Sequence, residues 1–217
     1  MTVLYLFDID GTLLDAHGSG RAAFDAVMAA QHGIAEASAG IRYGGKTDPQ
    51  LVDEIFVARL GRPATASERA AFLTAYVPEL VARLKVRVLA GAAESLAFLH
   101  GRVRLGIATG NIREGAEAKL AAAGLARWFE LGGYGSDSHV RAELVGRAIE
   151  RARELGHVRE VIVVGDTVHD IAAARACGAT VCAVATGTDP ASALGHADAV
   201  LASLRELPAW HAARYGD

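Results

Sequence analysis

Short apolar runs that alternate with longer, helix-like segments constrain the fold of this chain more than any other feature. The apolar runs, each bounded by turn residues, cover residues 3–7, 103–108, 161–164 and 181–185, with a weaker candidate at 131–134. The alanine-rich segments with helical spacing cover residues 113–123, 143–155 and 170–176. Short apolar runs are typical of buried strands, and strands that alternate with helices predict a parallel sheet covered on both faces. We therefore expect a doubly wound α/β fold.

The segment between the first two apolar runs departs from this alternation. Residues 16–87 contain helical patterns at 21–31, 49–60 and 67–84 and no convincing strand pattern. This segment is far longer than one crossover connection requires. We expect a small all-helical cap at residues 16–87, inserted after the first strand of a Rossmann-like core made of residues 1–15 and 88–217.

Charge and length exclude several classes of partner. The formal net charge of the 217 residues is -3, and no block of like charges occurs, which argues against nucleic acid or an anionic membrane as the main partner. The first apolar run is too short for a signal peptide or a membrane span, so we expect a cytoplasmic protein. The two cysteines, Cys177 and Cys182, lie in apolar surroundings and are interpreted as reduced thiols. A monomer and a homodimer both remain open.

Polar residues follow three of the predicted strands, where α/β proteins place their ligands. They are Asp8 and Asp10 after the first strand, Thr109, Gly110 and Asn111 after the second, and Asp166 and Asp170 after the third. Four carboxylates that meet at one edge of a sheet would repel one another without a cation, and Mg2+ suits such oxygen ligands best. Thr109 and the amides of Gly110 and Asn111 precede a helix, a position suited to phosphate. The pattern predicts a phosphoryl-transfer site for a small phosphorylated metabolite.

These motifs resemble those of the haloacid dehalogenase superfamily, and within it the phosphoglycolate-phosphatase-like members. The resemblance rests on DxDGT at residues 8–12, on Thr109, and on GDxxxD at residues 165–170. It extends over nearly the whole chain, because the helical insertion falls where that family carries its small cap. It implies a Mg2+-dependent phosphatase that acts through an aspartyl-phosphate.

The resemblance also implies a role for each motif residue. Asp8 would be the nucleophile, and Asp10 would be the general acid and base, with its backbone carbonyl on the metal. Asp166 would bind Mg2+ directly. Asp170 would either bind the metal itself or contact the residues that bind it. Thr109 and the neighbouring amides would bind the phosphoryl oxygens.

Two further residues are predicted to contribute to the site. The family places a lysine between the second and third motifs, whereas the candidate here is Arg141, which stays charged but is not equivalent to lysine. In the cap, Lys46 follows two glycines and is a candidate to reach the non-reacting end of the substrate. The alternative for this loop is a solvated helix start, with Asp48 as the N-cap and Pro49 as the first helical residue.

Other functions share parts of this pattern. An EF-hand loop fails, because it needs glycine where Leu13 stands. Dehalogenases lack the second aspartate, and phosphonoacetaldehyde hydrolases usually replace it, whereas Asp10 is present here. A phosphomutase of sugar phosphates keeps both aspartates and remains an alternative. A catalytically weak phosphate- or metal-binding regulatory module is the other, since Arg141 stands where a lysine is expected.

Overall fold

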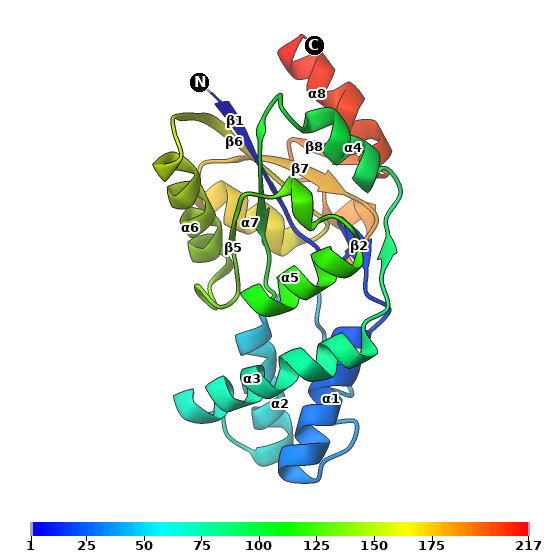
Figure 1. Cartoon of the computed structure of the whole chain (residues 1–217), viewed down its shortest axis with the longest axis vertical. Coiled ribbons are helices and arrows are strands. Elements are labelled where there is room, and N and C mark those ends of the chain that lie inside the picture. The colour runs from blue at the N-terminus through cyan, green and yellow to red at the C-terminus, as the bar shows by residue number, and fades with distance from the viewer. Residues whose placement is uncertain (1, 217) are drawn as a thin grey trace.

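Six parallel strands form the centre of the molecule in the computed structural model, which describes residues 2–216. In spatial order they are β5 (Leu131–Gly133), β4 (Arg104–Ala108), β1 (Thr2–Phe7), β6 (Val158–Gly165), β7 (Thr180–Val184) and β8 (Ala199–Leu201). Every neighbouring pair is parallel. Because β1 lies between β4 and β6, the loops that follow these three strands are neighbours at one edge of the sheet (Figure 1).

Alternate residues of β1 enter different hydrophobic clusters, as expected for a strand buried on both faces. Tyr5 and Phe7 belong to one apolar cluster, whereas Leu4 and Leu6 belong to the other. The helices that supply the Tyr5 side are α4 (Ala92–Leu99), α5 (Arg113–Ala122) and α8 (Leu207–Tyr215). Those that supply the Leu4 side are α6 (Arg141–Glu154) and α7 (Val168–Ala176). Single 3-10 turns cover Ala126–Trp128, Ala191–Ala193 and Leu204–Glu206. The predicted doubly wound α/β fold is confirmed.

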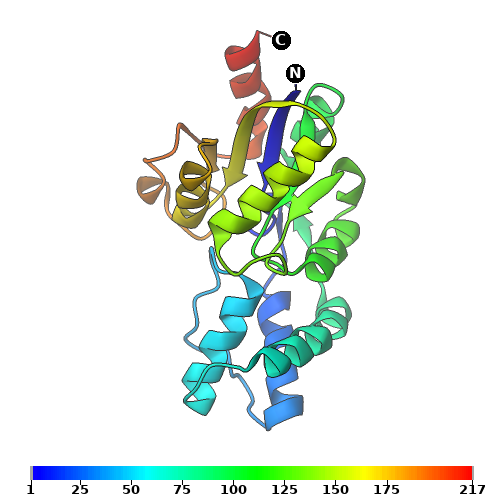
Figure 2. The same ribbon diagram turned by 90° about the vertical axis from the view of Figure 1, so that its left-hand side faces the viewer.

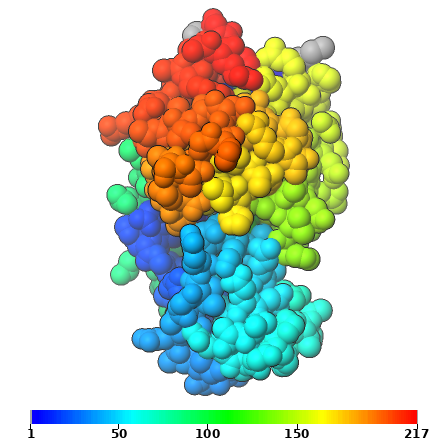
Figure 3. Space-filling model, turned by 180° about the vertical axis from the view of Figure 1, so that it is seen from behind, coloured from blue at the N-terminus to red at the C-terminus, as the bar shows by residue number. Residues whose placement is uncertain are grey.

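The inserted helices form a separate group below the sheet (Figures 1 and 2). They are α1 (Ser19–His32), α2 (Asp48–Leu60) and α3 (Ala66–Arg83). They enclose an apolar cluster that includes Phe24, Phe56 and Phe72, and Ile112 of the sheet-containing part packs into it. Figure 3 shows their blue and cyan surface in contact with the green, yellow and orange surface of the sheet-containing part.

The chain passes to the inserted helices and back through two short paired strands. These are β2 (Leu14–Asp15) and β3 (Arg87–Val88), which pair antiparallel with Leu14 opposite Val88 and Asp15 opposite Arg87. The two ends of the helical insertion are therefore held side by side.

No helix in the described part of the chain has both the length and the apolar character needed to cross a membrane.

Candidate active site

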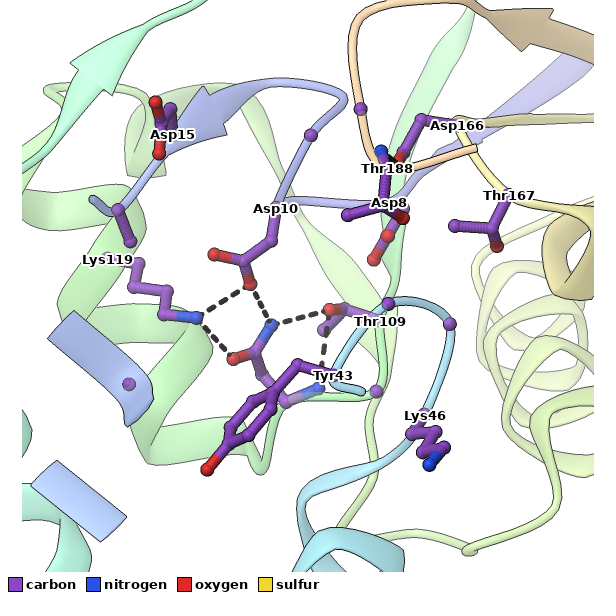
Figure 4. A pocket seen from close by; sticks show the side chains of 18 of the residues that line it. Asp8, Asp10, Asp15, Tyr43, Lys46, Thr109, Lys119, Asp166, Thr167 and Thr188 are labelled. Carbon is purple, nitrogen blue, oxygen red and sulfur yellow. Dashed lines mark hydrogen bonds and ion pairs between the residues drawn. The ribbon is translucent and has the colours of Figure 1, made fainter. Parts of the chain in front are cut away.

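Four loops meet at the carboxyl edge of the sheet, and three of them carry the polar residues that the sequence singles out (Figure 4). They supply Asp8 and Asp10 after β1, Thr109, Gly110 and Asn111 after β4, Asp166 and Thr167 after β6, and Thr186, Gly187 and Thr188 after β7. The contribution of the loop after β7 to the site was not predicted from the sequence. Its strand was predicted at residues 181–185, so the rule that placed the other three loops at this edge would also have placed this one.

Asp8, Asp166 and Asp170 form a buried cluster, in which one carboxylate oxygen of each lies within 4.8 Å of the others. Their exposed fractions are 6%, 1% and 2%. Burial, reinforced by repulsion from Asp8 and Asp170, raises the pKa of Asp166 to about 8. Burial also raises the pKa of Asp8 to about 6, although the Arg141 guanidinium acts in the opposite direction. Carboxylate oxygens held close together in this way fit a hard divalent cation such as Mg2+.

The Asp166 carboxylate is fixed by the two loops beside it. Thr12 Oγ1 donates to Asp166 Oδ1 at 3.0 Å, and the amide of Thr188 donates to Asp166 Oδ2 at 3.1 Å. Gly11 and Gly187 leave room for this carboxylate, because a Cβ at either position would lie 2.6 Å or 1.6 Å from Asp166 Oδ2. Gly11 also has a φ of 83°, which favours glycine. Asp166 is therefore oriented by its neighbours before any ligand binds.

Arg141 lies against the candidate nucleophile. It is the first residue of α6, and its side chain is 9% exposed. Its Nη2 lies 3.1 Å from Asp8 Oδ2 and donates to Asp170 Oδ1 at 2.7 Å, while its Nε donates to the same Asp170 oxygen at 2.9 Å. One guanidinium thus contacts two of the clustered carboxylates, a geometry that suits the planar fork of arginine.

Asp10 belongs to a different network, on the side of the site away from Asp166. Its Oδ2 accepts from Lys119 Nζ at 2.6 Å and from Asn111 Nδ2 at 2.8 Å (Figure 4). Lys119 Nζ also donates to Asn111 Oδ1 at 2.7 Å, and Asn111 Nδ2 donates to Thr109 Oγ1 at 2.8 Å. The loop after β1 and the loop after β4 are joined through these side chains.

Lys119 was not predicted from the sequence, although a signal for it exists. It lies in α5, where Ala116 and Leu120 are buried and mark the face that packs inward. Lys119 falls on that same face by helical spacing, and a lysine on a buried face needs a partner of opposite charge. The helix begins directly after the loop that holds Asn111, so the partner belongs to this site.

The loop before α2 lies directly on the sheet-edge loops. A Cβ at Gly44 would lie 2.4 Å from Thr188 Oγ1, and a Cβ at Gly110 would lie 2.2 Å from the Lys46 carbonyl oxygen. Only residues without a side chain allow so close an approach. The inserted helices and the sheet are therefore in close contact over the site.

Asp48 joins the two parts by hydrogen bonds. Its amide donates to the Gly110 carbonyl at 2.8 Å, and its Oδ2 accepts from the amide of Ile112, also at 2.8 Å. Asp48 is 6% exposed, and burial raises the pKa of its carboxyl to about 6, opposed by the nearby charge of Lys119. The interpretation of Asp48 as a solvated N-cap is wrong, because Thr47 is the N-cap of α2 and Asp48 is buried as the first helical residue. Its hydrogen bonds connect the inserted helices with the loop that precedes α5.

Lys46 lines the cavity, but its ammonium forms an ion pair with Glu54 of α2. In Figure 4 its side chain points away from the Asp8 carboxylate. A contact between Lys46 and a substrate requires this ion pair to open or to be shared.

A cavity of about 400 Å³ lies between the sheet edge and the inserted helices. Its floor includes Asp8, Asp10 and Asp166, and its opposite wall includes Phe24 and Tyr43. The volume suits a small metabolite. Because carboxylates, cations and backbone amides line the floor, the cavity fits a polar ligand that carries charge.

Comparison with known proteins decides the family. The family model of the haloacid dehalogenase-like hydrolases matches residues 3–178. The chain belongs to this family. The match includes all of the sheet-edge loops except the one after β7. It confirms the resemblance inferred from the motifs and the predicted class of enzyme, a phosphatase-type hydrolase.

This hydrolase is similar to a phosphoglycolate phosphatase of Cupriavidus necator, with 33% identity over 94% of this chain and 90% of the relative. Among solved structures, it is similar to CbbY from Rhodobacter sphaeroides in complex with phosphate, with a TM-score of 0.75, 20% identity and coverage of 95% and 96% of the two chains. A putative beta-phosphoglucomutase from Bacteroides vulgatus gives a TM-score of 0.72 at 19% identity and covers 98% of this chain and 89% of its own. At these identities the structural matches support the fold.

Proposed function

We propose that this hydrolase is a Mg2+-dependent phosphatase that cleaves a small phosphomonoester through a phosphorylated Asp8. The observation that carries the proposal is the position of Asp8, which stands between a carboxylate cluster suited to a cation and the Arg141 guanidinium. A carboxylate fixed from two sides is placed to attack a phosphorus atom, and the positive charges around it would offset the charge of the phosphoryl group.

The roles of the other residues follow from their places around Asp8. Mg2+ held by Asp8, Asp166 and Asp170, with the Asp10 carbonyl as a further candidate ligand, would neutralise charge on these carboxylates and on the phosphoryl oxygens. Asp10 would protonate the leaving oxygen and then take a proton from the attacking water.

The loop after β4 would bind the phosphoryl oxygens. Thr109 has a hydroxyl hydrogen available, because its Oγ1 acts only as an acceptor in the hydrogen bonds to Asn111. The amide of Gly110 remains a candidate for the same oxygens, and the amide of Asn111 would have to leave Thr109 Oγ1, to which it donates at 3.3 Å, to bind them.

The helical insertion, residues 16–87, would act as a cap that closes over the substrate and excludes water. The contacts of Gly44 and Asp48 with the sheet-edge loops support this role. Lys46 remains a candidate for contact with the non-reacting end of the substrate, in competition with Glu54.

The first substrate to test is 2-phosphoglycolate, because the relative from C. necator is a phosphoglycolate phosphatase and the cavity suits a small ligand. Phosphate release would be measured with Mg2+ over phosphoglycolate, sugar phosphates and nucleoside monophosphates, with Asp8→Asn as the control. We expect release from at least one small phosphomonoester and a loss of at least 10³-fold in Asp8→Asn, within the range known for active-site nucleophiles. Wild-type turnover in Asp8→Asn would refute the covalent mechanism.

Phosphate release distinguishes the proposed phosphatase from both alternatives, and an assay for interconverted sugar phosphates distinguishes the alternatives from each other. A phosphomutase would interconvert sugar phosphates without net phosphate release. A regulatory module would bind Mg2+ and release phosphate from none of the substrates.

A further inference from the structure

The hydrogen bonds on the Asp10 carboxylate are unequally shared between its two oxygens. Oδ2 accepts from Lys119 and from Asn111, at 2.6 Å and 2.8 Å. Among residues 2–216, no hydrogen bond to Oδ1 accompanies them. The Asp10 side chain is 41% exposed and lines the cavity. One oxygen is therefore held by the protein, and the other is open to a ligand.

Lys119 is held in a fixed position by the same contacts. Its side chain is only 5% exposed, and a buried ammonium is costly unless it has anionic and hydrogen-bonding partners. Asn111 Oδ1 provides a hydrogen-bonding partner throughout, and Asp10 provides the anion whenever its carboxyl is ionised. Asn111 lies just before α5 and Lys119 lies within it, so the two donors belong to one rigid segment. They fix the Asp10 carboxylate in its plane as well as in its position.

We propose that Lys119, together with Asn111, is a positioning residue that holds Asp10 by Oδ2 so that Oδ1 exchanges the proton with the leaving oxygen. The inference rests on the proposed function, in which Asp10 is the general acid. In the forward step the bond between phosphorus and the leaving oxygen breaks, the new bond forms to an Asp8 oxygen, and the proton passes from Asp10 Oδ1 to the leaving oxygen. Without Lys119 only Asn111 holds Oδ2, so the carboxylate can rotate about that one hydrogen bond and the proton is held less well in line with the leaving oxygen.

This role predicts an effect that depends on the leaving group. An alkoxide such as the one released from 2-phosphoglycolate needs a proton as it leaves, whereas p-nitrophenolate is a stable anion that needs little help. The quantity to compare is kcat/KM, because it covers the steps up to release of the leaving group and excludes the later hydrolysis of the phosphorylated enzyme.

The test compares Lys119→Met with wild type on an alkyl phosphate that the enzyme accepts and on p-nitrophenyl phosphate. We expect kcat/KM to fall about 10- to 100-fold for the alkyl substrate, which is part of the 10²–10⁴-fold typical of general acid catalysis, and less than about threefold for the aryl substrate. Asp10→Asn should show the same selectivity with a larger loss. Lys119→Arg, which retains a cation, should recover part of the alkyl activity.

Two controls separate positioning from a general effect on the fold. Lys85→Met removes an exposed lysine far along the chain from Asp10 and should leave both activities unchanged. Mg2+ affinity, measured by calorimetry, should be the same in Lys119→Met as in wild type, because Lys119 is outside the carboxylate cluster.

An equal fall on both substrates, or no fall on either, would overturn the inference. If Lys119→Met does not fold, the ratio of alkyl to aryl kcat/KM is measured in Lys119→Gln, and an unchanged ratio there has the same consequence. These outcomes are distinct from failure of the proposed function, in which the wild-type enzyme itself would release phosphate from neither substrate.

Discussion

Replacing Gly110 with alanine should uncouple the helical insertion from the active site. Gly110 lies in the loop after β4, and a Cβ there would be 2.2 Å from the carbonyl oxygen of Lys46. Real Cβ contacts are about 3.4 Å or longer, so the backbone around Lys46 must retreat by roughly 1 Å. The obstructing atom belongs to the backbone, and no side-chain rotation can relieve the clash.

The retreat should break the two hydrogen bonds that join Asp48 to the sheet-edge loops, one to the Gly110 carbonyl and one from the amide of Ile112. Each is worth about 1 kcal/mol, and somewhat more when the Asp48 carboxylate is charged. A displacement of about 1 Å at a substrate-enclosing element typically costs on the order of 10²-fold in rate. We therefore expect kcat/KM to fall by about 10²-fold in Gly110→Ala, while the sheet stays folded.

Phosphate release and hydrogen exchange test this prediction together. The amides of residues 46–52, except Pro49, and of residues 109–116 should exchange faster in Gly110→Ala, whereas the strands of the sheet should keep their protection. Gly146→Ala is the matched control, because Gly146 lies inside α6 with no atom within 4 Å of an added Cβ. It should retain full activity and gain up to about 1 kcal/mol of stability. Activity within about twofold of wild type in Gly110→Ala would refute the reasoning.

Three further predictions concern charge at the site. Arg141→Ala should lower kcat/KM more than tenfold, because Asp8 and Asp170 lose their shared cation. Arg141→Lys should recover part of the loss. Activity of Arg141→Ala within about twofold of wild type in a phosphate-release assay would remove Arg141 from the active site. Saturating Mg2+ at about 100 times its Kd should raise Tm by roughly 5–10 °C in a thermal-shift assay, and the rise should vanish with chelator or in Asp166→Ala. Burial raises the pKa of Asp48 from 3.8 to about 6, so the folded chain binds this proton more tightly than the unfolded chain. Ionisation of Asp48 therefore lowers the free energy of unfolding by roughly 2–3 kcal/mol above pH 6 and leaves it unchanged below about pH 4. Asp48→Asn should consequently be more stable than wild type at pH 7 and equal to it at pH 4 in urea unfolding, and a difference independent of pH would contradict this account.

The sequence predicted the α/β fold well because its strands are short apolar runs and its helices are longer segments with helical spacing. The β1 run is apolar at every position from Val3 to Phe7, as a strand covered on both faces must be. The missed strand β8 has only three residues, Ala199–Leu201, and its burial is partial because it lies at the edge of the sheet. The start of β6 was placed too late, since Arg159 and Glu160 interrupt the apolar pattern where the strand extends beyond the core.

The candidate site also contains residues that the sequence predicted and residues that it did not. Asp8, Asp166 and Asp170 could be brought together from the prediction of a parallel sheet alone, because all three follow strands whose carboxyl ends lie at one edge. That rule does not predict Lys119, because Lys119 lies in the second turn of helix α5 and not in a loop that follows a strand. Asp48 lies more than 60 residues before its partner Ile112, and only the docking of the inserted helices brings the two together.

The paired strands β2 and β3 have a consequence for how this enzyme can be remodelled. Residues 16–86 begin and end at neighbouring positions of one short ladder, Asp15 opposite Arg87. A segment whose two ends are already adjacent can be exchanged for another of different length without stretching the sheet. The chain thus passes between the sheet-edge loops and the inserted helices at a single paired junction. In the proposed function, substrate choice can change by exchange of the segment beyond this junction, while the carboxylates proposed to carry the chemistry stay where the strands hold them.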